Sequence, residues 1–381
     1  MPTPAVAQPW LGTTAGPLVG EHDLVLLDLD GVVYAGPAAI PGAPNHLSRC
    51  REAGARLGFV TNNASRPPAS VARHLRDIGV DAADTDVVTA AQAAARLVAD
   101  AVPPGSAVLV VGGEGLEVAL AEHDLTVVES ALDAPAAVVQ GLHPTVGWAM
   151  LAEGAYALAD GIPWIASNLD PTVPTERGRA PGNGALVDVL RATSGRAPQV
   201  AGKPEPALFH EAQRRLGGDR TLVVGDRLDT DIAGASRAGL PSLLVLTGVS
   251  ALAELCTAVG DDRPTFVAPD LAGLLVGHPE VESTDDGARC GRWMATVVDG
   301  ALQLTGPDAP ERGPDSAVTA LRAAVAACWA YRDARSDGGS TSKSGSESAA
   351  GEPDNQGRKP QPGRDTVDVC EAERQLHEMM T

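Results

Sequence analysis

The sequence is poor in aromatic residues and has no apolar run long enough to cross a bilayer. Only 3% of its 381 residues are Phe, Trp or Tyr, so Ala, Val and Leu must form most of the core. Residues 1–20 have neither a basic start nor a long apolar stretch, which argues against a signal peptide. We therefore expect a soluble globular protein of the cytoplasm, with no membrane partner.

Basic residues are also scarce. Lys and Arg number 29 against 49 Asp and Glu, and the formal net charge is −20. Such a surface repels nucleic acid, which we do not expect as a partner, and it also repels small phosphorylated molecules at long range. Any phosphate site must therefore carry local positive charge from a metal ion, a lysine or backbone N–H groups.

Several common site motifs are missing. The five cysteines contain no C-x-x-C pair, which fits a reducing compartment and argues against disulfides or structural zinc. No G-x-x-x-x-G-K-[ST], H-E-x-x-H or G-x-S-x-G is present, which argues against a P-loop NTPase, a zinc protease and an α/β-hydrolase. Residues 111–115 open a helix after a strand but lack G-x-G-x-x-G, so we interpret them as a structural turn.

Short apolar runs alternate with helical patterns along the chain. This alternation predicts an α/β fold with a doubly wound, Rossmann-like parallel sheet and helices on both faces. We expect strands at residues 25–29, 57–61, 108–111, 136–139, 163–166, 221–224 and 242–246. We expect helices at residues 69–78, 206–216 and 232–238, and a late strand and helix at 295–298 and 316–331.

Functional loops of such sheets lie at the carboxyl ends of the strands. Four expected strands end in polar motifs, at residues 28–31, 61–63, 202–204 and 225–226, with a long interval between the second and the third. That interval predicts an inserted α/β cap domain over the site. The expected division is a flexible lead (1–20), a core (21–85 and 198–282), the cap (86–197), a small C-terminal accessory extension (283–335) and a disordered tail (336–381).

Asp28 and Asp30 are the first candidate pair. They lie two residues apart at a strand end, point to the same side, and are followed by Gly31, which allows a sharp turn. Two adjacent carboxylates favour a hard divalent cation, most simply Mg²⁺. The same residues also fit an ordinary strand-to-turn transition without a metal.

The later motifs each leave two interpretations open. Asp226 and Asp231 follow an apolar run and fit either a metal site or an acidic capping loop. Lys203, between a glycine and a proline, fits either a charge-neutralising group or a surface lysine. Thr61 and Asn62 offer a hydroxyl and turning N–H groups, which suit phosphate but also any polar turn.

Together, the four motifs resemble the haloacid dehalogenase (HAD) superfamily. The order D-x-D-G, hydrophobic-T-N-N, G-K-P and G-D-x-x-x-x-D resembles subclass IIA, in which a large C2-type cap follows the second motif. That branch includes NagD-like and 4-nitrophenyl phosphatases and phosphatases of pyridoxal phosphate, phosphoglycolate and glycerol 3-phosphate. The resemblance covers residues 22–279, and residues 167–170 and 181–184 of the cap share it.

The resemblance implies a magnesium-dependent phosphatase. Asp28 would attack phosphorus and form an aspartyl-phosphate, and Asp30 would act as general acid and then general base. Mg²⁺ would be held by the Asp28 carboxylate, the Asp30 carbonyl and Asp226, with Asp231 behind these ligands. Thr61 and the Asn62 N–H would hold the phosphoryl oxygens, and Lys203 would offset their charge.

Asp30 and the position of the cap separate related activities. Ion pumps that resemble the superfamily carry threonine two residues after the nucleophile, and the short interval between Asp30 and Thr61 is too small for the cap of a phosphomutase. We expect a small phosphomonoester as substrate, with glycerol 3-phosphate first and 2-phosphoglycolate, pyridoxal phosphate or a nucleoside monophosphate as alternatives. A catalytically silent binding protein is the alternative of another class. By analogy with relatives that pair through the cap, a homodimer is a further expectation.

Overall fold

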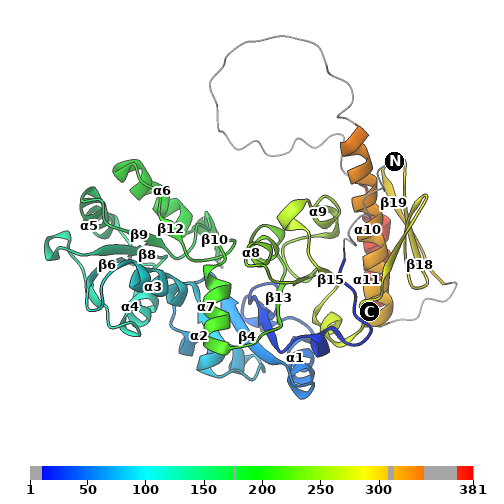
Figure 1. Cartoon of the computed structure of the whole chain (residues 1–381), viewed down its shortest axis with the longest axis horizontal. Coiled ribbons are helices and arrows are strands. Elements are labelled where there is room, and N and C mark those ends of the chain that lie inside the picture. The colour runs from blue at the N-terminus through cyan, green and yellow to red at the C-terminus, as the bar shows by residue number, and fades with distance from the viewer. Residues whose placement is uncertain (1–10, 176, 308–312, 339–366, 381) are drawn as a thin grey trace, which may run out of the picture.

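The protein is described by a computed structural model that covers residues 11–175, 177–307, 313–338 and 367–380. The described part contains three units, with the core in the middle, the cap on one side and a C-terminal domain on the other (Figure 1). Within these residues, no helix is both long and apolar enough to cross a membrane.

The core is a six-stranded, all-parallel sheet in the order β15-β14-β13-β1-β4-β5. Successive side chains of β1 enter opposite apolar clusters, because neighbouring residues of a strand point to opposite faces. Helices cover both faces, so the doubly wound α/β class is confirmed. The strands are β1 (Leu24–Leu27), β4 (Arg56–Thr61), β5 (Val87–Thr89), β13 (Thr221–Gly225), β14 (Ser242–Val245) and β15 (Phe266–Ala268).

Two groups of helices cover the core sheet. The first group packs with Val25 and Leu27, and the second with Leu24 and Leu26. The first contains α1 (Ala43–Glu52) and α2 (Pro68–Asp77), and the second contains α3 (Ala90–Ala101), α7 (Ala207–Leu216) and α8 (Ala233–Arg237). Shorter elements are η1 (Leu18–Glu21), η2 (Asp84–Asp86), η4 (Leu228–Ile232), η5 (Gly260–Asp262), η6 (Leu271–Leu275), α9 (Leu252–Cys256) and the hairpin β2–β3 (Tyr34–Ala35, Ala38–Ala39).

The cap is built on a five-stranded parallel sheet in the order β12-β9-β8-β6-β7. The apolar cluster around α3 and α7 contains core and cap strands together, so the two units share a continuous core. The elements of the cap are β6 (Ala107–Val111), α4 (Glu114–Ala121), β7 (Thr126–Val128), η3 (Ala131–Asp133), β8 (Ala137–Gln140), α5 (Trp148–Ala159), β9 (Trp164–Ala166), β10 (Thr172–Thr175), β11 (Gly178–Pro181), α6 (Asn183–Ser194) and β12 (Gln199–Val200).

Strand pairing moves both expected cap boundaries. β5 pairs with β4 in the core sheet, so the expected core limit at residue 85 is too early. β12 pairs with β9, so the cap sheet extends past residue 197. The strand before the loop at residues 202–204 is therefore a cap strand, and the expectation of a core strand there was wrong. A two-residue strand carries too little sequence pattern to reveal which sheet it joins.

The C-terminal domain is an antiparallel sheet covered by one long helix. The strands β16 (Val281–Thr284), β17 (Gly287–Cys290), β18 (Trp293–Val298) and β19 (Ala301–Thr305) pair in chain order. Helix α10 (Pro314–Gly338) lies against this sheet and carries α11 (Cys370–Met380) beside it (Figure 1). The expected late strand and helix are both present. One apolar cluster joins this domain to β14, β15 and α9 of the core.

Two expectations of disorder were wrong for the described residues. In the tail, Ala372, Leu376 and Met379 of α11 are buried at helical spacing, and Val369 just before the helix is buried too. The polar average composition of the segment hides this pattern. Residues 336–338 complete α10, whereas 339–366 and 381 lie outside the described residues.

In the lead, residues 11–20 pack on the core, and residues 1–10 lie outside the described range. Leu11, Leu18 and Val19 are buried. The Gly12 N–H donates to the Thr265 carbonyl at 2.8 Å, and the Thr14 N–H donates to the His278 carbonyl at 2.8 Å. Backbone pairing of this kind leaves no mark on the side-chain pattern, which explains why the composition misled.

Candidate active site

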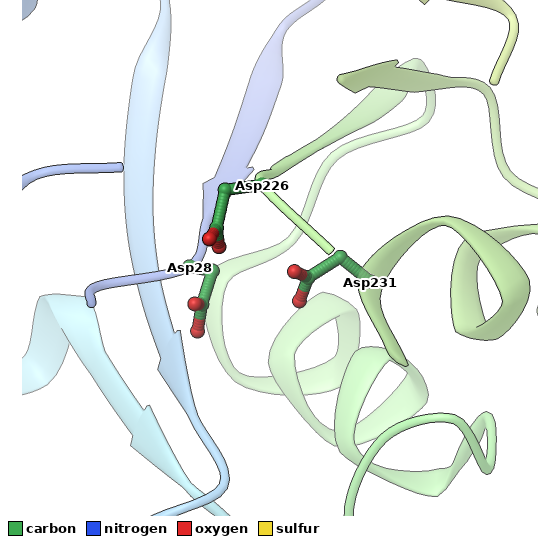
Figure 2. A group of neighbouring side chains, drawn as sticks. All are labelled: Asp28, Asp226 and Asp231. Atoms are coloured by element: carbon green, nitrogen blue, oxygen red, sulfur yellow. The ribbon is translucent and has the colours of Figure 1, made fainter. Parts of the chain in front are cut away.

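Three carboxylates meet at the carboxyl ends of the adjacent strands β1 and β13. Asp28 follows β1, Asp226 follows β13, and Asp231 lies in η4. Oxygen atoms of all three lie within 4.8 Å of one another, and Figure 2 shows their carboxyl groups gathered at one point. Parallel pairing of β1 with β13 therefore brings together aspartates that are far apart in the sequence.

Lys203 enters this cluster from the loop that leads into α7. Its Nζ lies 2.5 Å from Asp28 Oδ1 and 2.6 Å from Asp231 Oδ1, and only 4% of the residue is exposed. Burial disfavours the charged amine, but Asp231 and Asp28 outweigh it and raise the pKa of Lys203 above its ordinary value. The lysine is therefore a fixed cation between two carboxylates and does not fit a surface role.

Asp226 retains an unmatched oxygen. Its Oδ2 accepts the Val249 N–H at 2.7 Å, whereas its buried Oδ1 has no partner among the described residues. Burial, followed by Asp231 and Asp28, raises the pKa of Asp226 to about 7. An orphaned carboxylate oxygen beside two further carboxylates is the donor set that a hard divalent cation prefers, so these residues fit Mg²⁺.

Both carboxylate oxygens of Asp231 already accept hydrogen bonds from the protein, unlike those of Asp226. Its Oδ1 accepts Lys203 Nζ and its Oδ2 accepts the Arg227 N–H at 3.1 Å. Burial raises the pKa of the Asp231 carboxyl, and Lys203 partly opposes that rise. This carboxylate therefore fixes the lysine and the η4 loop in position.

Gly31 provides the turn after the first motif. Its φ of +84° lies in the region that glycine tolerates, and a Cβ there would come within 2.4 Å of Asp226 Oδ2. The two aspartate motifs can therefore approach each other only because this position has no side chain.

Asp30 is separate from the three-carboxylate group. It lies at the surface beside the β2–β3 hairpin, where its backbone bridges to Tyr34. Desolvation raises the pKa of Asp30, while Lys203 and His74 lower it. The rings of Tyr34 and His74 meet edge to face, with centroids 5.0 Å apart, and form one wall beside it.

Thr61 and Asn62 lie at the end of β4, the neighbour of β1. Thr61 Oγ1 accepts the Asn63 N–H at 3.1 Å, which turns the chain after the strand. Asn62 Oδ1 accepts the Lys203 N–H at 2.8 Å, and Asn62 Nδ2 donates to the Lys203 carbonyl at 3.1 Å. The second motif is therefore joined directly to the lysine loop.

Four further residues make contacts around the site, and the sequence interpretation assigned none of them a role in catalysis or binding. Asn168 and Asp170 follow cap strand β9 and contact Asn62, while Arg227 forms a bidentate pair with Asp229 and Val249 donates to Asp226. Among these four, Asn168 and Asp170 carried a signal, because they follow a predicted strand end and lie in the run 167–170 that shares the family resemblance. Apart from the Arg227–Asp229 pair, the contacts join residues distant in the chain.

Family models match both halves of the core. The model described as haloacid dehalogenase-like hydrolase matches residues 25–126, and a second HAD hydrolase-like model matches residues 200–274. Among curated proteins, D-glycerol 3-phosphate phosphatase of Mycobacterium tuberculosis is 46% identical over 316 residues, covering 82% of this chain and 88% of the relative. Acid sugar phosphatase of Staphylococcus aureus is 36% identical and covers 66% of this chain and 96% of the relative.

Solved structures give the same result. The glycerol phosphate phosphatase of M. tuberculosis in complex with magnesium matches with a TM-score of 0.73 and 44% identity, covering 83% of this chain and 92% of that one. The 4-nitrophenylphosphatase of Thermotoga maritima matches with a TM-score of 0.62 and 30% identity, covering 68% and 98%. The chain therefore belongs to the haloacid dehalogenase-like hydrolases.

Proposed function

We propose that the protein is a magnesium-dependent phosphatase whose substrate is glycerol 3-phosphate. The observation that carries this proposal is Lys203 Nζ in contact with both Asp28 and Asp231, next to the unpartnered Oδ1 of Asp226. The choice of substrate rests on the mycobacterial glycerol 3-phosphate phosphatase, which is 46% identical over most of both chains.

Asp28 is the proposed nucleophile. Its carboxylate oxygen attacks phosphorus, the bond to the ester oxygen breaks, and an aspartyl-phosphate forms. The contact with Lys203 orients the carboxylate and keeps a positive charge where the phosphoryl oxygens arrive. The hydroxyl of Thr61 and the N–H of Asn62 are the proposed donors to those oxygens.

Asp30 is the proposed acid and base. Its raised pKa favours the protonated carboxyl, which gives its proton to the leaving alkoxide. The resulting carboxylate then takes a proton from the water that attacks the aspartyl-phosphate. The hydrogen bonds of Lys203 Nζ go to Asp28 and Asp231, so the Asp30 carboxyl is not tied to the lysine.

The carboxylates of Asp28 and Asp226 and the carbonyl of Asp30 are the proposed ligands of Mg²⁺, with Asp231 behind them. The bound ion would neutralise the phosphoryl charge and relieve the repulsion between the carboxylates. The orphaned Asp226 Oδ1 supports this assignment.

A panel of phosphomonoesters tests the proposal. Phosphate release should be fastest from glycerol 3-phosphate, slower from 2-phosphoglycolate, pyridoxal phosphate and nucleoside monophosphates, and lost when Mg²⁺ is chelated. Equal and negligible release from every ester would support the catalytically silent binding protein instead. A preference for another ester would keep the activity but change the substrate.

Two further properties stay proposals. A cytoplasmic location is supported by five cysteines that form no disulfide among the described residues.

A homodimer through the cap is supported by exposed apolar side chains on its outer side, where Leu132 is 94%, Trp148 80% and Tyr156 59% exposed. Sedimentation should give twice the chain mass for the wild type and the single mass for Trp148→Glu, whereas a monomeric wild type would contradict the pairing.

A further inference from the structure

Asn62, the residue after the proposed phosphate-binding threonine, is held from two sides. On the core side, the Lys203 backbone hydrogen-bonds to both polar atoms of the Asn62 side-chain amide. On the cap side, Asn168 Nδ2 donates to the Asn62 carbonyl at 2.8 Å, and Asp170 Oδ2 accepts Asn62 Nδ2 at 3.2 Å. The cap thus touches the loop that would receive the phosphoryl group.

The two cap residues are themselves fixed. Asn168 is 5% exposed, and its Oδ1 accepts the Asp170 N–H at 3.1 Å. The Asn168 carbonyl accepts Asn183 Nδ2 at 2.8 Å, at the start of α6. Asp170 Oδ1 lies 3.9 Å from Arg227 Nη1, so the core loop of Asp226 also holds this carboxylate. A continuous polar network therefore runs from α6 of the cap to Lys203.

Close backbone packing removes the room for independent movement at this junction. A Cβ on Gly115, at the start of cap helix α4, would lie 2.2 Å from the Ala64 carbonyl oxygen. A Cβ on Gly202 would lie 2.5 Å from the Ser167 carbonyl oxygen and 2.6 Å from Asn62 Oδ1. Since no methyl group fits between the cap and these loops, the cap cannot come closer to residues 62–64 without moving them.

We infer that Asn168 and Asp170 are positioning residues for phosphoryl transfer, acting through Asn62 on the phosphate loop and on Lys203. This inference rests on the proposed function. The cap thereby completes the part of the site that handles the phosphoryl group, which every substrate shares, in addition to enclosing the organic part. Loss of either contact frees the segment that places Thr61 and Lys203 around phosphorus.

Single substitutions separate this role from a structural one. Asn168→Ala and Asp170→Ala should lower kcat about tenfold to a hundredfold, by the same factor for glycerol 3-phosphate and 4-nitrophenyl phosphate. Asp170→Asn retains an acceptor oxygen for Asn62 Nδ2 and should recover most of kcat. Asp188→Ala is the matched control, since it removes an exposed cap carboxylate that pairs with Arg191 on the surface of α6.

Two glycine substitutions, each at the start of a cap helix, provide a second test. Gly115→Ala should lower kcat on both esters because its Cβ would press on Ala64. Gly147→Ala should not, since its Cβ would meet its nearest atom at 3.9 Å. Both variants should melt within a few degrees of the wild type. This comparison tests the inference even if Asn168→Ala does not fold.

Unchanged kcat in Asn168→Ala and Asp170→Ala would overturn the inference, as would a loss confined to glycerol 3-phosphate, which would indicate a contact with the glycerol part. Orthovanadate with Mg²⁺ separates this result from failure of the proposed function. If the wild type hydrolyses no ester, it should still gain melting temperature from orthovanadate, and the two alanine variants should gain less. Equal gains, or no gain in the wild type, would overturn the inference.

Discussion

The cap and the C-terminal domain both rest on the core, but the contacts of the cap reach the proposed site residues, whereas those of the C-terminal domain lie elsewhere. The cap combines a shared apolar cluster with a polar network that ends at Asn62 and Lys203. The C-terminal domain meets β14, β15 and α9 through an apolar cluster, and polar contacts such as the bidentate Arg263–Asp333 pair lie beside that cluster. Within the described ranges, none of its residues hydrogen-bonds to Asp28, Lys203, Asp226 or Asp231. This difference predicts that loss of cap contacts will lower kcat, whereas loss of C-terminal contacts will lower stability.

A buried arginine supports the stabilising role of the C-terminal interface. Arg322 in α10 is fully buried, yet its partners are the carbonyls of Pro279 and Gly12 and the ring of His278. The guanidinium therefore joins the N-terminal segment, the end of the core and the long helix. Its five donors suit this role, because each can satisfy a different backbone carbonyl.

Lys203→Met, a substitution in the core next to the cap contacts, should have the largest effect on kcat. It removes the cation between Asp28 and Asp231, so kcat should fall about a thousandfold with glycerol 3-phosphate and with 4-nitrophenyl phosphate. Phosphate release at saturating substrate measures this. Arg237→Met is the control, because Arg237 pairs with Glu205 at an exposed position of the core. A similar loss in both variants would contradict a special role for the buried amine.

Trp329→Ala tests the C-terminal side of the comparison. Trp329 is fully buried, donates from Nε1 to the Leu255 carbonyl at 2.8 Å, and lies under the Arg263 guanidinium. Its truncation should cost about 3–5 kcal/mol of unfolding free energy, because a large cavity opens between α9 and α10. Urea unfolding measures the loss, and kcat well below the melting temperature should change little. A fall in kcat comparable to that of Lys203→Met would break the comparison.

His278 gives the C-terminal junction a pH dependence. Burial, together with Arg322, lowers the pKa of His278 to about 4, although its bond to the Gly273 carbonyl opposes this. The unfolded chain takes up the proton near pH 6.5, so between pH 6.5 and 4 protonation favours unfolding. Stability should therefore be full above pH 6.5 and should fall as the pH drops, by about 3 kcal/mol near pH 4.

Urea titrations of the wild type and His278→Gln between pH 4 and 7 check this expectation. The wild type should show the steeper fall, and the difference between the two proteins should become independent of pH above pH 7. Parallel curves would show that His278 carries no such effect. Because the junction is remote from Asp28, kcat of the two proteins should agree at neutral pH.

Prediction from sequence worked where a local pattern carries the information. The buried strands β1, β4, β13 and β14 are short apolar runs. Asp28 and Asp226 directly follow β1 and β13, and Thr61 is the last residue of β4. Lys203 needed the order of all four motifs, because its preceding strand β12 has two residues and joins the cap sheet. The helical pattern of α7 indicated only the element that comes after the lysine.

Contacts between distant segments could not be predicted in the same way. Asp170 meets Asn62 and Arg227 only because the cap folds over β4 and β13. The ordered lead depends on backbone pairing of Gly12 and Thr14, and α11 is stabilised by packing on α10. In each case the stabilising partner lies far along the chain, and the composition of one segment does not reveal which distant segment it contacts.

Asp28→Asn, assayed for phosphate release from glycerol 3-phosphate in the presence of Mg²⁺, tests the central claim most directly. The amide retains the shape of the side chain but is a very weak nucleophile, so turnover should fall to background. The melting temperature should stay near that of the wild type, since Lys203 keeps its contact with Asp231. Turnover that survives this substitution in a folded protein would contradict Asp28 as the nucleophile on which the cap network converges.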